Sequence, residues 1–465
     1  MRQVAAGPRR RRRPPHKMQN NSRWCKMSLV EKVVKYALKL GADEAHAVYG
    51  RSRETSIEME SDQISRTSYG VSESINVTVI VGKRIASARV NAVTEQAALA
   101  CTEKAYRMAL ALKPNENWSE LPEPKPLKDV PELYDKKIAE LTAEEIAERA
   151  KNMLQTAREV SDKVHVMGGN ISTTINKHVM ATSRGFYGEE ERTTFIASLV
   201  TVAKDAGKVG SFASESDASR KLDVNVEEIA EKAAQKALDS LNLKPVESFK
   251  GTLVLDYEFA AWLIRSLAGA YNGYYVWKKN SPLTDKIGEQ IASEILTVID
   301  DGALPAGLAS SRFDGEGSPT ARTVVIERGV LKTFINNTFT ANILGMKPTG
   351  NAWNLLFVGP WNTLVEPGDC SEEELISEVK RGLLVSRFSG MIRFQDGLVS
   401  GTAKQAFYVE NGEKKFPVGE CMIAGNLYDF IKNISALGKT AKRTPFAVIT
   451  PQIKIENVNF ITKNS

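Results

Sequence analysis

Four histidines limit the hydrolytic chemistry that this chain could perform: His16, His46, His165 and His178. A catalytic zinc site takes three protein ligands, most often including histidine, and keeps one position open for water. No histidine follows residue 178, so a helical pair of histidine ligands is excluded from the second half of the chain. A zinc site there would need carboxylates alone or cysteine with carboxylates, which is an unusual set for this metal.

The histidines of the first half do not suggest a metal site either. His46 lies in an apolar segment between Ala45 and Ala47, where a packed and hydrogen-bonded histidine is the commoner state. His165 and His178 lie in neighbouring strand-like segments and could meet across a hairpin. Two ligands alone do not complete a site, so we expect no metal there.

Other hydrolytic and phosphate-binding motifs are missing. The chain has no G-x-S-x-G elbow for a nucleophilic serine and no phosphate loop with its lysine. Residues 313–320 read "FDGEGSPT", in which Asp314 and Glu316 would repel a phosphate. These acids could chelate a cation, but a tight turn with solvated carboxylates is the commoner arrangement for such a sequence.

Cysteine spacing and hydropathy indicate the compartment. Cys25, Cys101, Cys370 and Cys421 show no CxxC spacing, which argues against a disulfide framework or a zinc knuckle. No apolar run approaches the roughly 18 to 20 residues that span a bilayer, and the N-terminus lacks the apolar core of a signal peptide. We therefore expect a soluble protein in the reducing cytoplasm, with no membrane partner.

The positive charge of the chain is concentrated at its N-terminus. Residues 1–26 carry nine positive charges and no acid, so a net charge of +6 for the whole chain becomes −3 for residues 27–465. The run "PRRRRRPP" could bind nucleic acid, but proline and arginine in this density do not form a packed core. We expect residues 1–26 to be a disordered basic extension, and we do not expect nucleic acid as a partner of the remainder.

The first half reads as helices packed on strands. Ser28 and Glu31 form a capping pattern for a helix that stops at Gly41, and a second helix is predicted from Thr94 to Leu112. Between them, alternating segments over 45–91 predict strands, with a hairpin turning at Gly82-Lys83. This is the predicted N-terminal subdomain, residues 27–113.

A proline-rich connector separates this subdomain from the middle region. Residues 114–131 contain five prolines in a polar setting, which is typical of a semi-extended segment. A helix capped by Thr142 follows, and then strands over 164–215 and a helix over 226–241. The middle region, residues 132–245, therefore completes the N-terminal half.

The C-terminal domain, residues 246–465, mixes its elements. A buried strand over 251–257 is predicted to run directly into an apolar helix. Further elements are expected to be strands over 323–335 and 354–359, a helix ending at residues 344–352, a helix from Ser371 to Leu384, and a hairpin over 405–418 that turns at Asn411-Gly412. The irregular order predicts a two-domain α+β fold with mixed or antiparallel sheets and packed helices.

An aromatic segment in the C-terminal domain is the candidate contact surface. Residues 271–279 read "YNGYYVWKK", and tyrosine and tryptophan in such clusters supply contact area at protein or peptide interfaces. The segment "GMKPTGNAW" at 345–353 is a second candidate. The predicted substrate or partner surface is Tyr271, Tyr274, Tyr275, Trp277, Asn351 and Trp353.

Three separated motifs resemble a known family. Residues 307–352 ("GLASSRFDGEGSPTARTVVIERGVLKTFINNTFTANILGMKPTGNA"), 407–418 ("FYVENGEKKFPV") and 423–438 ("IAGNLYDFIKNISALG") resemble the TldD/PmbA family, and specifically its PmbA (TldE) branch. The resemblance covers residues 28–463, and its motifs occur in the family's order.

The resemblance implies a subunit without zinc. In the TldD branch, the helix after the first strand of the C-terminal domain carries HExxxH, and those positions fall here on Arg265, Ser266 and Ala270. The late cysteine of that branch has no counterpart, because Cys421 lies before "AGNL" rather than after it. No catalytic residue, metal ligand or cofactor is therefore expected in this chain. Arg265 could pair with a carboxylate of a partner or a peptide C-terminus, although an ordinary salt bridge is the commoner arrangement.

Three functions remain open. The first is the non-catalytic subunit of a TldD–TldE heterodimer, in which the zinc of a TldD-type partner cleaves unfolded peptides and this chain helps to form the chamber. The second is a regulatory or binding protein of the gyrase-modulator kind, which acts without proteolysis. The third is an enzyme on its own, with a metal held by carboxylates or by His165 and His178. The chain could also form a homodimer, because related subunits share a fold.

Overall fold

The computed structural model describes residues 22–462. Residues 1–21 of the predicted basic extension lie outside the described part. The first helix, α1 (Ser22–Lys39), begins before the predicted cap at Ser28. Residues 22–27 contain neither glycine nor proline, so no residue there stops the helix from extending in the N-terminal direction.

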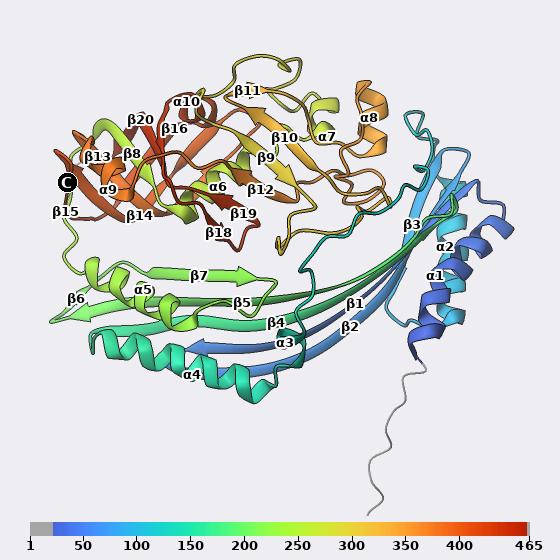
Figure 1. Ribbon diagram of the computed structural model, residues 1–465, viewed down its shortest axis with the longest axis horizontal. Coiled ribbons are helices and arrows are strands. Elements are labelled where there is room, and N and C mark those ends of the chain that lie inside the picture. Colours follow the sequence, from blue (N-terminus) through green and yellow to red (C-terminus); the bar gives the residue numbers. More distant parts are fainter. Residues whose placement is uncertain (1–21, 463–465) are drawn as a thin grey trace, which may run out of the picture.

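A long antiparallel sheet makes up most of the N-terminal half, and Figure 1 shows it lying beneath the C-terminal domain. Its strands follow the order β3-β2-β1-β4-β5-β6, with β7 also paired to β5. The predicted segments over 45–60 form one continuous strand, and the hairpin at Gly82-Lys83 is confirmed. The strands are β1 (Glu44–Glu60), β2 (Gln63–Val81), β3 (Arg84–Val90), β4 (Val164–Thr182), β5 (Tyr187–Asp205), β6 (Lys208–Val209) and β7 (Ala213–Ser219).

Helices cover two parts of one face of this sheet, where alternate residues of the strands are apolar. Ala45, Ala47 and Tyr49 of β1 lie under α1 and α2 (Glu95–Ala111), and Ile57 and Met59 lie under α4 (Ala143–Val160) and α5 (Val226–Asp239). The predicted cap at Thr142 is confirmed, because its side chain forms a capping box with Glu145 on α4. The Thr94 side chain caps α2, at the predicted start of that helix. The short helix α3 (Lys136–Glu140) precedes α4. The opposite face of the sheet turns toward the C-terminal domain.

The C-terminal domain contains two mixed sheets, which confirms the predicted α+β class. Strand β8 pairs with β13 in parallel and with β20 antiparallel, and β12 pairs with β19 in parallel. One sheet contains β8 (Phe249–Leu255), β13 (Arg381–Ile392), β14 (Leu398–Glu410), β15 (Glu413–Val418), β16 (Cys421–Asn426), β17 (Ile434–Leu437) and β20 (Ile453–Ile461). The other contains β9 (Val298–Asp301), β10 (Arg322–Glu327), β11 (Val330–Leu331), β12 (Asn362–Val365), β18 (Lys442–Thr444) and β19 (Val448–Thr450).

Short helices connect these strands. They are α6 (Tyr257–Leu267), α7 (Gly273–Trp277), α8 (Thr338–Leu344), α9 (Glu372–Ser377) and α10 (Leu427–Lys432). No helix of the described chain is long and apolar enough to cross a membrane.

Two secondary-structure predictions for this domain were wrong. Residues 354–359 form no strand, because the Asn354 side chain accepts hydrogen bonds from the Leu356 and Phe357 amides, each at 3.0 Å, and bends the chain. The helix predicted to reach Leu384 ends at Ser377, because residues 381–385 form a strand buried between β8 and β14. The hairpin at Asn411-Gly412 is confirmed, with both residues at positive φ.

Polar contacts join the two halves. The buried Glu190 carboxylate of β5 accepts hydrogen bonds from the Ser311 hydroxyl at 2.6 Å and from the Arg312 amide at 2.9 Å. Arg443 of β18 pairs with Asp217 of β7 at 2.7 Å. The Arg220 guanidinium donates to the Gly307 carbonyl at 3.1 Å.

Replacing Glu190 with glutamine tests this junction. Both carboxylate oxygens of Glu190 now accept a hydrogen bond, whereas the amide nitrogen of glutamine would point at one of these two donors and leave it without an acceptor. We therefore expect Glu190→Gln to lower the free energy of unfolding by about 1–3 kcal/mol. Urea denaturation followed by tryptophan fluorescence measures the change. Glu54→Gln, at an exposed residue of β1, is the matched control. Equal stability of the two variants would contradict the assignment of Glu190 to the junction.

Candidate functional site

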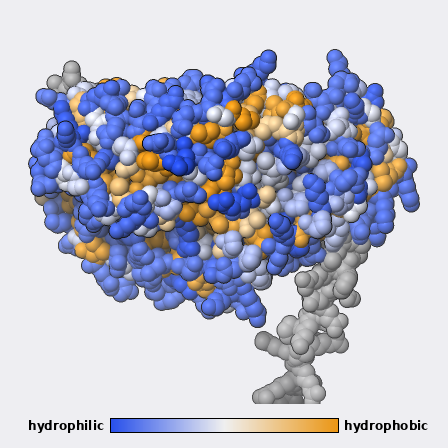
Figure 2. Space-filling view, turned by 45° about the horizontal axis from the view of Figure 1, so that its top comes forward, coloured by the Kyte–Doolittle hydropathy of each residue, from blue (hydrophilic) through white to orange (hydrophobic). Residues whose placement is uncertain are grey.

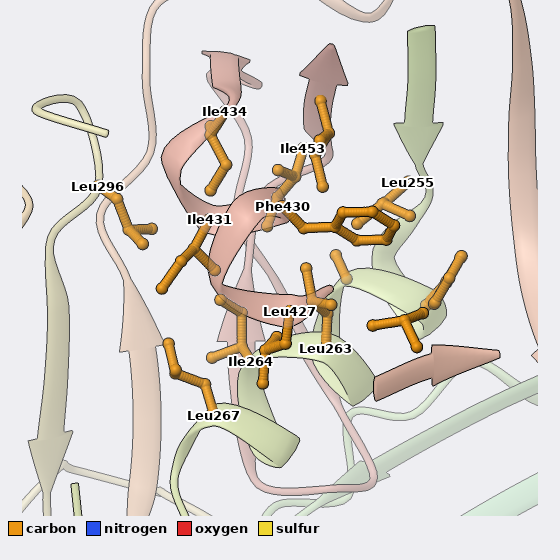
Figure 3. Packing of buried hydrophobic residues seen from close by; sticks show 14 of the residues in the cluster. Leu255, Leu263, Ile264, Leu267, Leu296, Leu427, Phe430, Ile431, Ile434 and Ile453 are labelled. Carbon is orange, nitrogen blue, oxygen red and sulfur yellow. The ribbon is translucent and has the colours of Figure 1, made fainter. Parts of the chain in front are cut away.

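Helix α6 presents the candidate site because only one of its sides is buried. Leu263, Ile264 and Leu267 face α10 and the neighbouring strands, and Figure 3 shows these three side chains opposite those of Phe430 and Ile431. The other side of the helix carries Trp262, Arg265 and Ser266, which are partly or fully exposed. The apolar spacing of the helix therefore determines which residues reach solvent.

The start of α6 is held by both halves of the chain. Asp256 occupies the N-cap position, but its side chain does not cap the helix. Its carboxylate instead accepts hydrogen bonds from the Ser386 hydroxyl at 3.1 Å and from the side-chain amide of Gln452 at 3.2 Å. The Lys236 ammonium of α5 lies 3.5 Å from the same carboxylate. Asp256 thus links α6 to the sheet of its own domain and to the N-terminal half.

At the three positions where the TldD branch carries its zinc motif, the side chains make other contacts or are buried. The exposed Arg265 guanidinium donates to the Phe446 carbonyl at 2.8 Å, and the Ser266 hydroxyl donates to the Trp262 carbonyl at 2.8 Å. Ala270 is fully buried. The salt bridge expected for Arg265 is not found: no carboxylate within residues 22–462 pairs with it. Arg265 instead tethers α6 to the loop before β19.

A charged cleft lies at the first turn of α6, between the two halves. It encloses about 530 Å³ and is lined by α5, β7, the first turn of α6 and the segment 442–446. Seven carboxylates face four cationic side chains in this cleft. The acids are Glu215, Asp217, Asp223, Glu228, Asp256, Glu258 and Glu372, and the cations are Lys232, Lys236, Lys442 and Arg443.

Among the acids of this cleft, Glu258 has the pKa that is shifted furthest from its ordinary value. Burial raises the pKa of its carboxyl to about 7, although the nearby charges of Arg387 and Lys236 oppose the shift. Arg443, by contrast, is paired with Asp217 and Asp223. Lys442 places its ammonium 4.2 Å from the centre of the Tyr257 ring. The cleft therefore combines paired charges with one carboxyl that gains a proton near neutral pH.

Asp314 and Glu316 are buried, which corrects the expectation of a solvated turn. The Asp314 carboxylate accepts hydrogen bonds from the Ser318 amide at 2.9 Å and the Ala352 amide at 3.1 Å. Glu316 accepts from the Thr338 hydroxyl at 2.6 Å and the Thr338 amide at 2.9 Å. Burial raises the pKa of both carboxyls. The pair connects three loops, and the described residues hold no group of three or more potential metal ligands.

Tyr271 and Asn351 are fully buried, so their assignment to a surface was wrong. Asn351 donates to the buried Asp300 carboxylate at 2.6 Å, and the Trp361 amide donates to the same carboxylate at 2.7 Å. Burial raises the pKa of Asp300 to about 7 and that of Tyr271 well above its usual value. The Tyr271 hydroxyl makes no hydrogen bond of standard geometry within residues 22–462, although Thr363 lies close enough to affect its pKa.

Sequence reasoning missed two acids of this region, Glu258 and Asp300. Asp300 follows the apolar run "ILTVI", and an acid at the end of a buried strand is the signal that could have identified it. Glu258 lies within the first turn of α6, where an acidic residue is ordinary, so its sequence position carried no such signal.

The histidines do not form a pair across a hairpin. His165 and His178 lie on the same strand, β4, thirteen residues apart, which corresponds to roughly 40 Å. His165 contacts Asp62 at 3.2 Å, and His178 stacks on Phe313. Burial lowers the pKa of His46 and of His178 to about 4. His46 is packed as expected, but its Nε2 has no hydrogen-bond partner in the described chain.

The remaining aromatic candidates do lie together at the surface. The Tyr274 ring lies 5.7 Å from that of Trp277 and 5.0 Å from that of Phe357, and the Lys278 ammonium lies 3.6 Å from the Trp277 ring centre. Phe357 is 47% exposed and Trp353 is 59% exposed. Figure 2 shows further apolar residues exposed among hydrophilic ones on the face it presents. Tyr275, also partly exposed, packs against Phe394 at 4.9 Å.

Three sequence models of one family match this chain in succession. They are the PmbA/TldA metallopeptidase domain 1 at residues 45–109, the central domain at 136–241 and the C-terminal domain at 248–462. Together they cover most of the chain. A metalloprotease from Methanocaldococcus jannaschii is 29% identical over 401 residues, covering 82% of this chain and 87% of that protein.

Solved structures share the fold over nearly the whole length. TldE from Thermococcus kodakarensis superimposes with a TM-score of 0.88 at 29% identity, covering 93% of this chain and 100% of that chain. A protein from Thermotoga maritima, described as a candidate modulator of a DNA gyrase, superimposes with a TM-score of 0.84 at 26% identity, covering 93% and 99%.

The raised pKa of Glu258 predicts how stability depends on pH. Between the ordinary value of 4.5 and about 7, the folded chain keeps a proton that the unfolded chain releases. Folding stability of the wild type should therefore fall as the pH rises through this window, by up to about 3 kcal/mol. Glu258→Gln should lack this slope, and the difference is measured by urea denaturation at a series of pH values.

A second acid of the same cleft provides the control. Glu372→Gln removes a carboxylate from the lining and should leave the slope of the wild type in place. Parallel curves for the wild type and Glu258→Gln would contradict the burial of this carboxyl.

Proposed function

This chain belongs to the PmbA/TldA metallopeptidase family, and from that membership we propose that it is the subunit of a two-subunit zinc peptidase that does not hold the zinc. A TldD-type subunit would supply the metal and the hydrolysis of unfolded peptides. The observation that carries the proposal is the set of side chains at the motif positions: Arg265, Ser266 and Ala270.

These side chains do not fit zinc. A guanidinium is a fixed cation with no lone pair to offer, and an alanine methyl group cannot ligate. The Ser266 hydroxyl already donates to the carbonyl one turn earlier in its own helix. No group of three potential ligands lies elsewhere in residues 22–462, which also disfavours the chain as an independent metalloenzyme.

A subunit without chemistry can still form the walls of a chamber. The face of the long sheet that turns toward the C-terminal domain is rich in hydroxyl side chains, because Ser52 of β1 lies opposite Ser72 of β2, and Ser56 opposite Ser68 and Ser172. Such a face offers hydrogen bonds without selecting particular side chains. The charged cleft beside α6 opens between this sheet and the C-terminal domain. Both features suit an extended chain whose backbone is accessible.

The exposed aromatic residues supply the candidate surface for the partner. Phe357 is exposed beside Tyr274, which contacts Trp277, and the exposed Trp353 is joined to Phe357 by a backbone hydrogen bond. Aromatic side chains of this kind dominate the binding energy of many interfaces. We place the contact with the zinc-bearing subunit at these four residues.

A regulatory function is the second candidate. Its support is the similarity to the Thermotoga maritima protein, which is described as a candidate modulator of a DNA gyrase. A protein of that kind would bind its target with no peptide hydrolysis in any combination of subunits. Reconstitution with a zinc-bearing partner distinguishes the two functions.

Reconstitution is the main test. We expect the purified chain to contain no stoichiometric zinc by elemental analysis and to leave casein intact. Mixing it with an HExxxH-bearing TldD-type subunit should produce chelator-sensitive digestion, and a partner whose motif glutamate is changed to glutamine should not. Stoichiometric zinc and chelator-sensitive cleavage by the pure chain would refute the proposal, and partner binding without hydrolysis would favour the regulatory function.

The aromatic surface can be tested separately. We expect Phe357→Ala and Trp353→Ala each to weaken binding of the zinc-bearing subunit roughly tenfold or more, because truncating a central aromatic residue removes at least about 1.4 kcal/mol of binding energy. Titration calorimetry measures the affinity. Phe212→Ala is the matched control, since Phe212 is 49% exposed but lies in the N-terminal half. Unchanged affinity in both aromatic variants would remove these residues from the interface.

A further inference from the structure

The long sheet has an open edge along β2. Strand β3 pairs with β2 only over residues 75–81, and β1 occupies the other side of β2 along its whole length. On the side of β2 that faces away from β1, no described strand pairs with residues 63–74. Figure 1 shows β2 at the margin of the sheet away from the C-terminal domain.

Between residues 66 and 74, this edge lacks the features that normally prevent strands from pairing between molecules. Natural edge strands are shortened, bulged, or protected by proline and lysine. Residues 63–74 read "QISRTSYGVSES", with neither proline nor lysine. The register with β1 shifts between Ile64 and Arg66, and it is continuous from Arg66 to Ser74. Most residues from 65 to 72 are exposed. The edge is therefore available as a template for another strand.

The side chains of this edge are arranged symmetrically about a glycine. Tyr69 is 67% exposed and Val71 is 47% exposed, and they flank Gly70 on the same face of β2. A second β2 strand laid antiparallel about Gly70 would place each Tyr69 opposite the Val71 of the other strand. Aromatic and β-branched residues form favourable pairs in this position.

We propose that residues 66–74 of β2 pair antiparallel, about a twofold axis at Gly70, with the same residues of a second copy of this chain. The pairing ends at Ser74 because the next residue, Ile75, pairs with Val90 of β3. The same register sets Ser68 opposite Ser72 of the second copy. It sets Thr67 opposite Glu73, so no like charges meet.

A second copy fits this edge better than an unrelated peptide because the register uses the same residues twice. A twofold interface is self-complementary, and only an identical edge brings the valine, the glycine and the tyrosine in reversed order. Each sheet would then continue into the other, and the open edge of both would be covered over residues 66–74. This assembly uses a different surface from the aromatic residues assigned to the zinc-bearing subunit, so it does not depend on the proposed function.

Cross-linking at the axis tests the register. A side chain at Gly70 would meet no atom within 4 Å, so Gly70→Cys should fold as the wild type does. In the proposed dimer the two cysteines face each other at a separation that a disulfide can bridge. We expect mild oxidation of the full chain to convert most of Gly70→Cys to a covalent dimer on a non-reducing gel.

A neighbouring glycine provides the matched control. Gly50 of β1 also has no atom within 4 Å of an added side chain, but β1 lies inside the sheet, one strand further from the axis. Gly50→Cys and the wild type should remain uncross-linked under the same oxidation. Equal cross-linking of the two cysteine variants, or none in Gly70→Cys, would overturn the proposal.

Sedimentation equilibrium gives an independent measurement. We expect the wild type to be dimeric and Val71→Lys to dissociate with a dissociation constant raised roughly tenfold or more, because the lysine is a known protector of edges and removes the apolar pair. Circular dichroism and thermal unfolding check that the variant is folded. A monomeric wild type at the highest concentration reached, or an undiminished Val71→Lys dimer, would refute the proposal. So would cross-linking of Gly70→Cys only to a different protein.

Discussion

The one-sided burial of α6 is the constraint on which the candidate site depends. Leu263 and Ile264 are fully buried in a close-packed core shared with α10, so the helix cannot rotate about its axis without opening voids. Its outer side is thereby fixed, and with it the direction of Arg265 and Ser266. Asp256 secures the first turn through hydrogen bonds from Ser386 and Gln452. Packing thus fixes which positions of α6 face outward, and the residue types at those positions determine what chemistry the helix can support.

Directional polar contacts hold the two halves in one orientation. Glu190 accepts hydrogen bonds from a loop of the C-terminal domain, and Arg443 pairs with Asp217 across the cleft. Asp314 and Glu316 tie together the loops beneath, with backbone amides as their main donors. Buried polar groups are costly when unsatisfied, so the hydrogen bonds of Glu190 penalise a shift of one half against the other. The contacts of Asp314 and Glu316 lie within the C-terminal domain and fix its loops. The cleft beside α6 owes its shape to this set of bonds.

Local chemistry made much of the fold predictable. The cap at Thr142, the helix start at Thr94 and the turns at Gly82 and Asn411 depend on neighbours a few residues away, and all four were identified from the sequence. Residues 381–384 were assigned to a helix because their strand partners, β8 and β14, are distant in the chain. Such long-range pairing overrides local preference.

The site was predictable in type but not in exposure. That Arg265 and Ala270 offer no lone pair to a metal ion could be read from the sequence, and the absence of zinc from this chain stays a prediction. Tyr271 was assigned to the surface because its aromatic neighbours suggested one, yet burial is a property of the tertiary fold. The raised pKa of Glu258 has the same origin, since desolvation depends on elements far away in sequence.

The connectivity of the long sheet has a consequence during synthesis. Strand β1 lies between β2 and β4, and His46 of β1 pairs with Thr182 of β4. The β1–β2 hairpin can form early. The free edge of β1 cannot pair with β4, however, until the ribosome has added more than a hundred further residues. Pairing between strands so distant in the chain slows folding, and until it occurs the apolar surface and the strand edge stay exposed and prone to aggregation. The nascent chain is therefore a natural client for chaperones over that interval.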